Sequence, residues 1–84
     1  MSRPTRAAGL SEIELDGEYV VYDGTRLHRL DPTAAAVWAL VDGRTAEDAI
    51  VKRLSKAYGA PREQVATDVA ALLDALRTAG LLAG

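Results

Sequence analysis

Apolar and polar positions in the first third of the chain follow the two-residue period of β-strands. Ile13 and Leu15 alternate with glutamates, which predicts a strand with one face in water, and the next segment is apolar on both faces, as in a middle strand. Asp-Gly pairs at 16–17 and 23–24 favour tight hairpin turns. The pattern therefore predicts a three-stranded antiparallel sheet, with strands over residues 10–15, 18–23 and 26–30.

From residue 31 onward, apolar residues recur with the period of an α-helix. Asp31 is a favourable helix cap, and Pro32 suits the first helical position, where its missing N–H costs nothing. The Asp-Gly pair at 42–43 is typical of the end of a helix. The stripe that this first helix buries consists of Ala34, Val37, Trp38 and Val41.

Two further helices follow with short connections. Thr45 and Asp48 resemble a capping box for the second helix, which ends at Gly59. Pro61 opens the third helix, and Gly80 ends it. The order of elements is therefore βββααα. This order predicts an α+β fold of the winged helix-turn-helix type, in which a three-stranded antiparallel sheet is followed by three helices.

Neither half of the chain is expected to fold alone, because a sheet of three short strands is marginal and each helix buries only one face. We therefore expect one core, centred on Trp38, whose neighbours are Leu54, Leu72 and Leu76. Residues 1–9 show no periodic apolar pattern, which predicts a flexible N-terminal tail. Residues 10–84 are then a single domain.

Composition narrows the range of functions. The chain has 84 residues, no cysteine and one histidine, His28. A domain this small has little room for both a full core and a deep enzyme pocket, and without cysteine it has no thiolate nucleophile, disulfide or cysteine-based metal site. The serines have no neighbouring base, and there is no glycine-rich phosphate loop. The sequence therefore predicts a protein that is not an enzyme and has no catalytic residue, metal or cofactor.

The lack of long apolar segments predicts a cytoplasmic protein that does not enter membranes. No apolar run approaches the roughly 20 residues that cross a bilayer. The N-terminus also lacks the apolar stretch of a signal peptide. The formal net charge of −2 argues against non-specific binding to nucleic acid, which depends on an excess of lysine and arginine.

Two alternative functions stay open, and the first comes from the helical half. The helices have the outline of a helix-turn-helix, and a basic patch lies on or beside the second one: Arg44, Lys52, Arg53 and Lys56. Acidic residues line the third helix, which would normally enter the DNA groove, so a small winged-helix nucleic-acid-binding module is the less favoured interpretation. A module that binds a folded enzyme at an interface, and no peptide, is the other alternative.

The third strand, at the edge of the predicted sheet, is the more informative site. It would leave one row of backbone N–H and C=O groups unpaired. Arg26 and Arg29 either guard this edge against unwanted pairing or flank a place where another chain adds as a strand, and both interpretations are open. Beside its core stripe the third helix carries a row that would leave a shallow groove if it faced this strand: Gln64, Asp68, Ala71 and Ala75.

Several strings of the chain, taken in order over about residues 10–82, resemble the PqqD-like family. The family signature of a strand, Leu-Asn/Asp, small residues and Ile/Val-Trp is similar to residues 19–23, 28–31 and 33–40. The family's DG-x-T turn looks like residues 42–45, and its ending, V-x-x-DV followed by LL, L and GLL, looks like residues 65–82.

The resemblance implies a winged-helix-like recognition element for ribosomally made peptides that are later modified. It implies that the leader segment of a precursor peptide adds to the third strand and lies in a groove against the third helix. The leader would be presented to a modifying enzyme such as a radical S-adenosylmethionine (radical SAM) protein, or to a leader peptidase or cyclase in a lasso-peptide system. Mapped onto this chain, the peptide-contacting residues are Arg26, Leu27, His28, Arg29, Asp68, Ala71, Leu72 and Ala75.

The N-terminal part of the chain departs from the family pattern. The first strand is short, and the turn at residues 23–25 is tighter than the loop that many members carry. This departure leaves open whether the first strand pairs within the chain or is displaced or swapped in a dimer.

Overall fold

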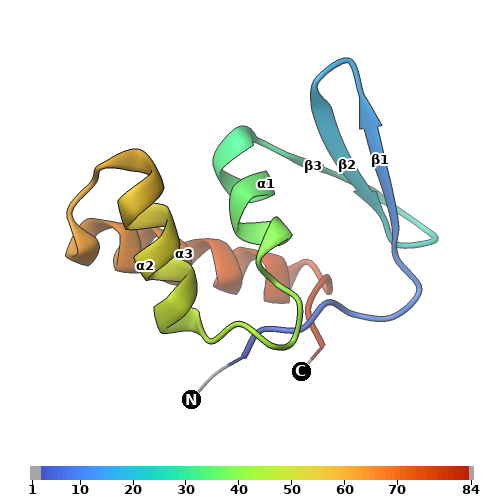
Figure 1. Cartoon of the computed structure of the whole chain (residues 1–84). Helices are drawn as coiled ribbons and strands as arrows, with labels where there is room; N and C mark the ends of the chain where they lie inside the picture. Colours follow the sequence, from blue (N-terminus) through green and yellow to red (C-terminus); the bar gives the residue numbers. More distant parts are fainter. Residues whose placement is uncertain (1–2, 84) are drawn as a thin grey trace.

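Along the chain the strands of the sheet come first and the helices follow (Figure 1). The computed structural model describes residues 3–83; Met1, Ser2 and Gly84 lie outside the described residues. The elements are β1 (Ser11–Leu15), β2 (Glu18–Tyr22), β3 (Leu27–Leu30), α1 (Pro32–Ala39), α2 (Glu47–Tyr58) and α3 (Arg62–Thr78). The strands pair antiparallel in the order β1-β2-β3, which confirms the predicted βββααα fold.

A tight turn sets the register of the first hairpin. Asp16 and Gly17 both have positive φ, 54° and 80°, as the two central residues of a type I′ turn require. They join Leu15 to its partner Glu18. The first strand, whose pairing the sequence leaves open, thus pairs within the chain with β2.

The two faces of the sheet are covered unequally. Val21, on the face toward the helices, is fully buried, whereas all five residues of β1 are exposed. The alternation in β1 predicts that glutamates face water and apolar residues face the core, and this expectation is wrong. Glu12 pairs with Val21 and lies on the side of the helices, while Ile13 and Leu15 lie on the opposite face.

Trp38 joins the sheet, the helices and the N-terminal segment. Its ring is almost fully buried, and its Nε1 donates a hydrogen bond to Glu12 Oε1 at 2.8 Å. The Arg6 guanidinium lies over the ring, 4.6 Å from its centroid, and also pairs with Glu12. Burial acts to raise the pKa of Glu12, but hydrogen bonds from Trp38 and Tyr19 and the charge of Arg6 outweigh it and hold that pKa below its usual value. This cluster explains why Glu12, rather than Ile13, turns toward the helices.

The N-terminal segment is tied to the rest of the chain. Pro4 is buried, and its carbonyl accepts a hydrogen bond from the Gly43 N–H at 2.9 Å. The Ala7 N–H donates to the Leu81 carbonyl, also at 2.9 Å. The segment predicted as a flexible tail therefore makes backbone hydrogen bonds to distant residues, which leave no periodic pattern in the sequence. The part of the prediction that concerns the first two residues lies outside the described residues.

One apolar core joins the sheet to the helices. Trp38, Leu54 and Leu76 are buried together, as the sequence predicts, whereas Leu72 is half-buried at the margin of the core. α1 begins at its predicted cap, Asp31, whose side chain accepts the backbone N–H of its third helical residue. No helix within residues 3–83 is long and apolar enough to cross a membrane.

The turn before α2 is held differently from the prediction. Thr45 and Asp48 do not form a capping box: the cap of α2 is Ala46, without a side-chain hydrogen bond. Instead, Asp42 Oδ1 accepts the backbone N–H groups of Arg44 and Thr45, both at 2.8 Å. In a capping box the Asp48 side chain would accept the Thr45 N–H, but the Asp42 side chain accepts it instead.

Candidate functional site

β3 leaves one of its edges open. The Asp23 N–H donates to the Arg26 carbonyl at 3.1 Å, in the same register as the pairs between β2 and β3. Because bonded and non-bonded pairs alternate along an antiparallel ladder, His28 is the next residue whose backbone bonds to β2. The N–H and C=O groups of Leu27 and Arg29 therefore point away from β2, toward an edge that no other strand of residues 3–83 covers.

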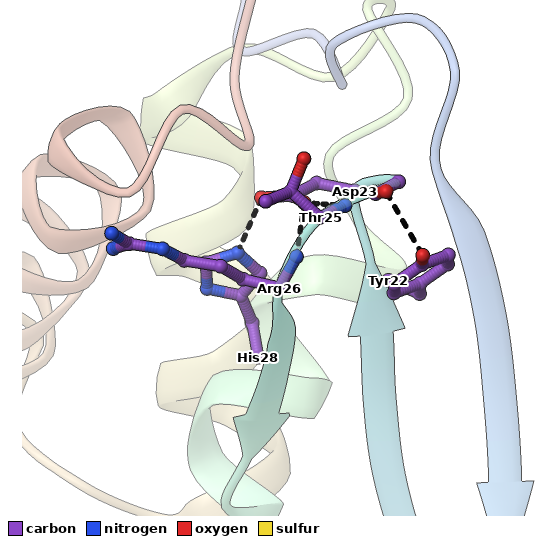
Figure 2. A network of polar contacts seen from close by, with 6 residues as sticks. Tyr22, Asp23, Thr25, Arg26 and His28 are labelled. Atoms are coloured by element: carbon purple, nitrogen blue, oxygen red, sulfur yellow. Dashed lines mark hydrogen bonds and ion pairs between the residues drawn. The ribbon is translucent and has the colours of Figure 1, made fainter.

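Asp23 fixes the start of this edge strand (Figure 2). Its Oδ1 accepts the backbone N–H groups of Thr25 at 2.8 Å and Arg26 at 2.7 Å, and its Oδ2 lies 2.8 Å from His28 Nε2. The hydrogen bond with His28, followed by those from the two backbone groups, lowers the pKa of Asp23 to about 2. A single carboxylate thus ties the turn to the first residues of β3.

The four predicted strand residues lie on two faces of the sheet. His28 is half-buried on the face toward the helices, and in Figure 2 the Arg26 side chain extends toward the side on which α3 lies. Leu27 and Arg29 are exposed on the opposite face, where Arg29 Nε lies 3.6 Å from a carboxylate oxygen of Glu18. Of the four, only Arg26 and His28 are therefore placed to line a groove against α3.

An apolar hollow of about 200 Å³ opens beside Asp68 and Leu72 of α3. Thr33, in the first turn of α1 directly after β3, forms part of its wall together with Val37. The volume is below the roughly 300–1,000 Å³ of small-molecule pockets and suits the side chains of an extended peptide better. The structure thus brings Asp68 and Leu72 together at a recess whose wall includes Thr33, three residues after the end of β3.

Ala71 and Ala75, the two other predicted helix residues, are exposed on α3. With 3.6 residues per turn, Ala75 follows Leu72 on the flank that carries Asp68, and Ala71 lies further round toward solvent. The stripe that packs into the core is Val65, Val69, Leu73 and Leu76. Contact of either alanine with a guest peptide stays a prediction.

Two features of the site were missed by reasoning from the sequence. Tyr58, the last residue of α2, is largely exposed and lines the hollow with Thr33. An aromatic residue outside the apolar stripe of its helix is the signal that could have identified it. The pairing of Asp23 with His28 was also missed, because the Asp-Gly pair indicates a turn but not what the aspartate binds.

A larger, open depression of about 380 Å³ lies at the first turns of α2 and α3. Its lining includes the carboxylates of Glu47, Asp48 and Glu63 and the guanidinium of Arg62. Nowhere in the part of the chain that the structure describes do three or more histidine, aspartate or glutamate side chains come together as metal ligands would. None of the predicted site residues lines this depression.

Comparison with known families identifies the chain. Residues 18–82 match the family described as coenzyme PQQ synthesis protein D (PqqD). The chain belongs to the PqqD family. The match runs from β2 to the segment after α3, and therefore includes both the open edge of β3 and the hollow beside α3. A search of curated protein sequences found no match.

Solved structures share the PqqD-family fold over nearly the whole chain. Lasso peptide synthetase B1, complexed with the leader peptide, has 26% sequence identity and a TM-score of 0.84, covering 99% of this chain and 100% of that one. The PqqD truncation of Methylobacterium extorquens PqqCD, a stand-alone recognition element for ribosomally synthesised and post-translationally modified peptides, has 26% identity and a TM-score of 0.82, covering 96% and 88%. TbiB1 in complex with the TbiA(beta) leader peptide has a TM-score of 0.84 over 95% of each chain; at 24% identity this likeness shows the fold alone.

Proposed function

We propose that this member of the PqqD family binds the leader segment of a ribosomally made precursor peptide and has no catalytic role of its own. The leader adds as a strand to β3 and lies between β3 and α3. The observation that carries the proposal is the open edge of β3 together with the apolar hollow at Leu72, whose wall includes Thr33, three residues after β3. The likeness to lasso peptide synthetase B1, which is solved with a leader peptide, supports it.

Backbone pairing alone does not hold such a guest. Leu27 and Arg29 together offer two N–H and two C=O groups, and at about 1 kcal/mol net per hydrogen bond these give roughly 4 kcal/mol. Micromolar affinity needs about 8 kcal/mol after the costs of association. Each apolar side chain that the guest buries adds about 1.5 to 3 kcal/mol. The leader must therefore carry apolar residues that enter the hollow or cover other apolar surface of the site.

The bound leader is presented to an enzyme that acts on the precursor. Candidates are a radical SAM protein, or a leader peptidase or cyclase in a lasso-peptide system. The likeness to lasso peptide synthetase B1 over the whole chain favours the second group. In either case the protein acts by positioning, because holding the leader raises the effective concentration of the precursor at the enzyme.

A nuclear magnetic resonance titration tests the proposal. The isotope-labelled protein is titrated with the synthetic leader segment of the precursor encoded beside its gene. We expect the backbone amides of Leu27 to Leu30 and of Asp68 to Ala75 to shift together. Shifts that centre on Lys52 to Lys56 and leave the amides of β3 unchanged would contradict the proposal. Binding of duplex DNA with a steep salt dependence would instead favour the nucleic-acid-binding alternative.

A further inference from the structure

The face of the sheet that turns away from the helices, the outer sheet face, is rich in apolar side chains. The pairing register places on it Ser11, Ile13, Leu15, Glu18, Val20, Tyr22, Leu27 and Arg29. Four of the five large hydrophobic side chains exposed among residues 3–83 lie there: Ile13, Leu15, Tyr22 and Leu27. Single exposed apolar residues are ordinary, but a group gathered on one face indicates a surface that is covered in use.

A strand added to β3 would extend the outer sheet face by one row. Because side chains alternate along a strand, the guest residues beside Leu27 and Arg29 point to this face. The guest residue between them points toward the helices, beside His28. This division holds whichever way the guest runs, and it places the two outer guest residues two positions apart in sequence.

The two outer positions differ in chemistry. Leu27 is 67% exposed and lies opposite Tyr22 of β2, so the surface there is apolar. The Arg29 side chain is 75% exposed, and its ion pair with Glu18, itself 55% exposed, spans 3.6 Å. An ion pair this long and this exposed is weak, which leaves the guanidinium available to an acidic side chain of the guest.

We propose that the outer sheet face selects the leader: its added strand carries an apolar residue against Leu27 and, two residues away, an acidic residue against Arg29. This inference rests on the proposed function, since it needs a guest on β3. It adds a requirement on the outer side of the guest strand, separate from the residues that enter the hollow. The guest class is therefore an extended segment with an apolar and an acidic side chain on its outer side.

The apolar half of the proposal is tested with a matched pair of leucines. Leu27 and Leu15 lie on the same face with nearly equal exposure, 67% and 66%, but on opposite edges of the sheet. Leu27→Ser should weaken binding of the synthetic leader by about five- to tenfold, because it removes the apolar contact. Leu15→Ser removes the same side chain two strands away and should leave the affinity unchanged. Equal effects of the two variants would overturn this half.

The acidic half is tested by selection from a random peptide library against the wild-type protein and Arg29→Glu. Arg29 is exposed, so the variant should fold, which circular dichroism checks. Peptides enriched on the wild-type protein should carry Asp or Glu two residues from an apolar residue, and those enriched on Arg29→Glu should carry Lys or Arg at that position. In fluorescence anisotropy, each mismatched combination should bind about two- to fivefold more weakly than the matched one.

The outcomes separate this inference from the proposed function. Enrichment of the same sequences on both proteins, with amide shifts still centred on β3, overturns the acidic requirement and keeps β3 as the binding edge. Absence of amide shifts at β3 with any enriched peptide overturns the proposed function itself, and the inference with it.

Discussion

β1 and β3 are the two edge strands of the same sheet, and they offer a guest similar backbones in different surroundings. On β3 the outward N–H and C=O groups belong to Leu27 and Arg29. On β1 the same alternation assigns them to Glu12 and Glu14, because a two-residue hairpin turn is closed by a bonded pair. Each edge is thus open along a short row of backbone groups.

The surroundings of the two rows differ in charge and in shape. On the edge of β1 Glu12 is bound by Trp38 and Arg6 and Glu14 adds an acidic side chain, whereas arginines flank the edge of β3. The apolar hollow beside Leu72 is lined by the helices and includes Thr33, three residues after β3, whereas β1 is far from these residues in sequence and contributes none of them.

An open edge is therefore not by itself a binding site. A few backbone hydrogen bonds give too little free energy to hold a peptide, so the edge next to an apolar recess is the one at which a guest is stable. The charges add selectivity, since an acidic guest is repelled from β1 and attracted to β3. Each of the following experiments either removes this difference between the edges or measures it.

The largest effect is expected from Trp38→Ala, which removes the support of both edges. The ring is 1% exposed and anchors Glu12 of β1 as well as the core below β3. We expect the free energy of unfolding to fall by about 3 to 5 kcal/mol. Urea denaturation followed by circular dichroism measures it, with Tyr58→Ala, an exposed aromatic residue, as the control. A loss below about 1 kcal/mol would contradict the role of Trp38 as the residue that joins the sheet to the helices.

Ala75→Glu tests whether α3 forms the wall that distinguishes β3 from β1. The alanine is exposed, so the fold should persist, but the added charge would face the guest and weaken leader binding by about tenfold or more. Ala70→Glu places the same charge on the other flank of the helix and should leave the affinity unchanged. Ala71→Glu should have a smaller effect than Ala75→Glu. Unchanged affinity in Ala75→Glu would mean that another face of α3 meets the guest.

A proline at each edge compares the two rows of backbone groups directly. Arg29→Pro removes one outward N–H of β3 and should weaken leader binding by about fivefold relative to Arg29→Ala, which loses the same side chain. Glu14→Pro does the same on β1 and should match Glu14→Ala. Isothermal titration calorimetry gives the four affinities. If proline weakens leader binding equally on both strands, relative to alanine, the leader does not distinguish the two edges.

The smallest effect concerns the pH dependence of the turn that starts β3. The pKa of Asp23 is about 2, below its ordinary value of 3.8, so the folded state favours the charged carboxylate. Its contribution to stability is present above the ordinary pKa and is lost as the pH falls from about 4 toward 2. Asp23→Asn should therefore flatten the acid slope of the free energy of unfolding, measured by urea denaturation across this range. An unchanged slope would show that Asp23 does not hold the turn.

Local chemistry explains what was predicted correctly from the sequence. The Asp-Gly pair at 16–17 forms its hairpin turn, and Asp31 caps α1, because each depends on neighbouring residues only. The ordered strings that resemble PqqD-like proteins indicate the family, which the match over residues 18–82 confirms. The eight peptide-contacting residues as a set stay a prediction, although two of them, Asp68 and Leu72, line the hollow.

The features that the sequence did not indicate have other causes. The segment predicted as a flexible tail contains a hydrogen bond between Pro4 and Gly43, which lie far apart in sequence. The capping box at Thr45 does not form because Asp42, just outside the motif, accepts the Thr45 N–H. One partner is distant in sequence, and the other is a neighbour that the motif does not include.

The sequence by itself determined the order of the strands and helices, the first hairpin turn and the family, because turn chemistry and apolar periodicity act over a few residues. Only the tertiary structure decided which face of β1 lies in water and which edge of the sheet has an apolar wall. The first depends on Trp38 and Arg6 converging on Glu12, and the second on α1, α2 and α3 enclosing a hollow that includes Thr33, three residues after β3. Both are contacts between distant segments, which no pattern along the chain records.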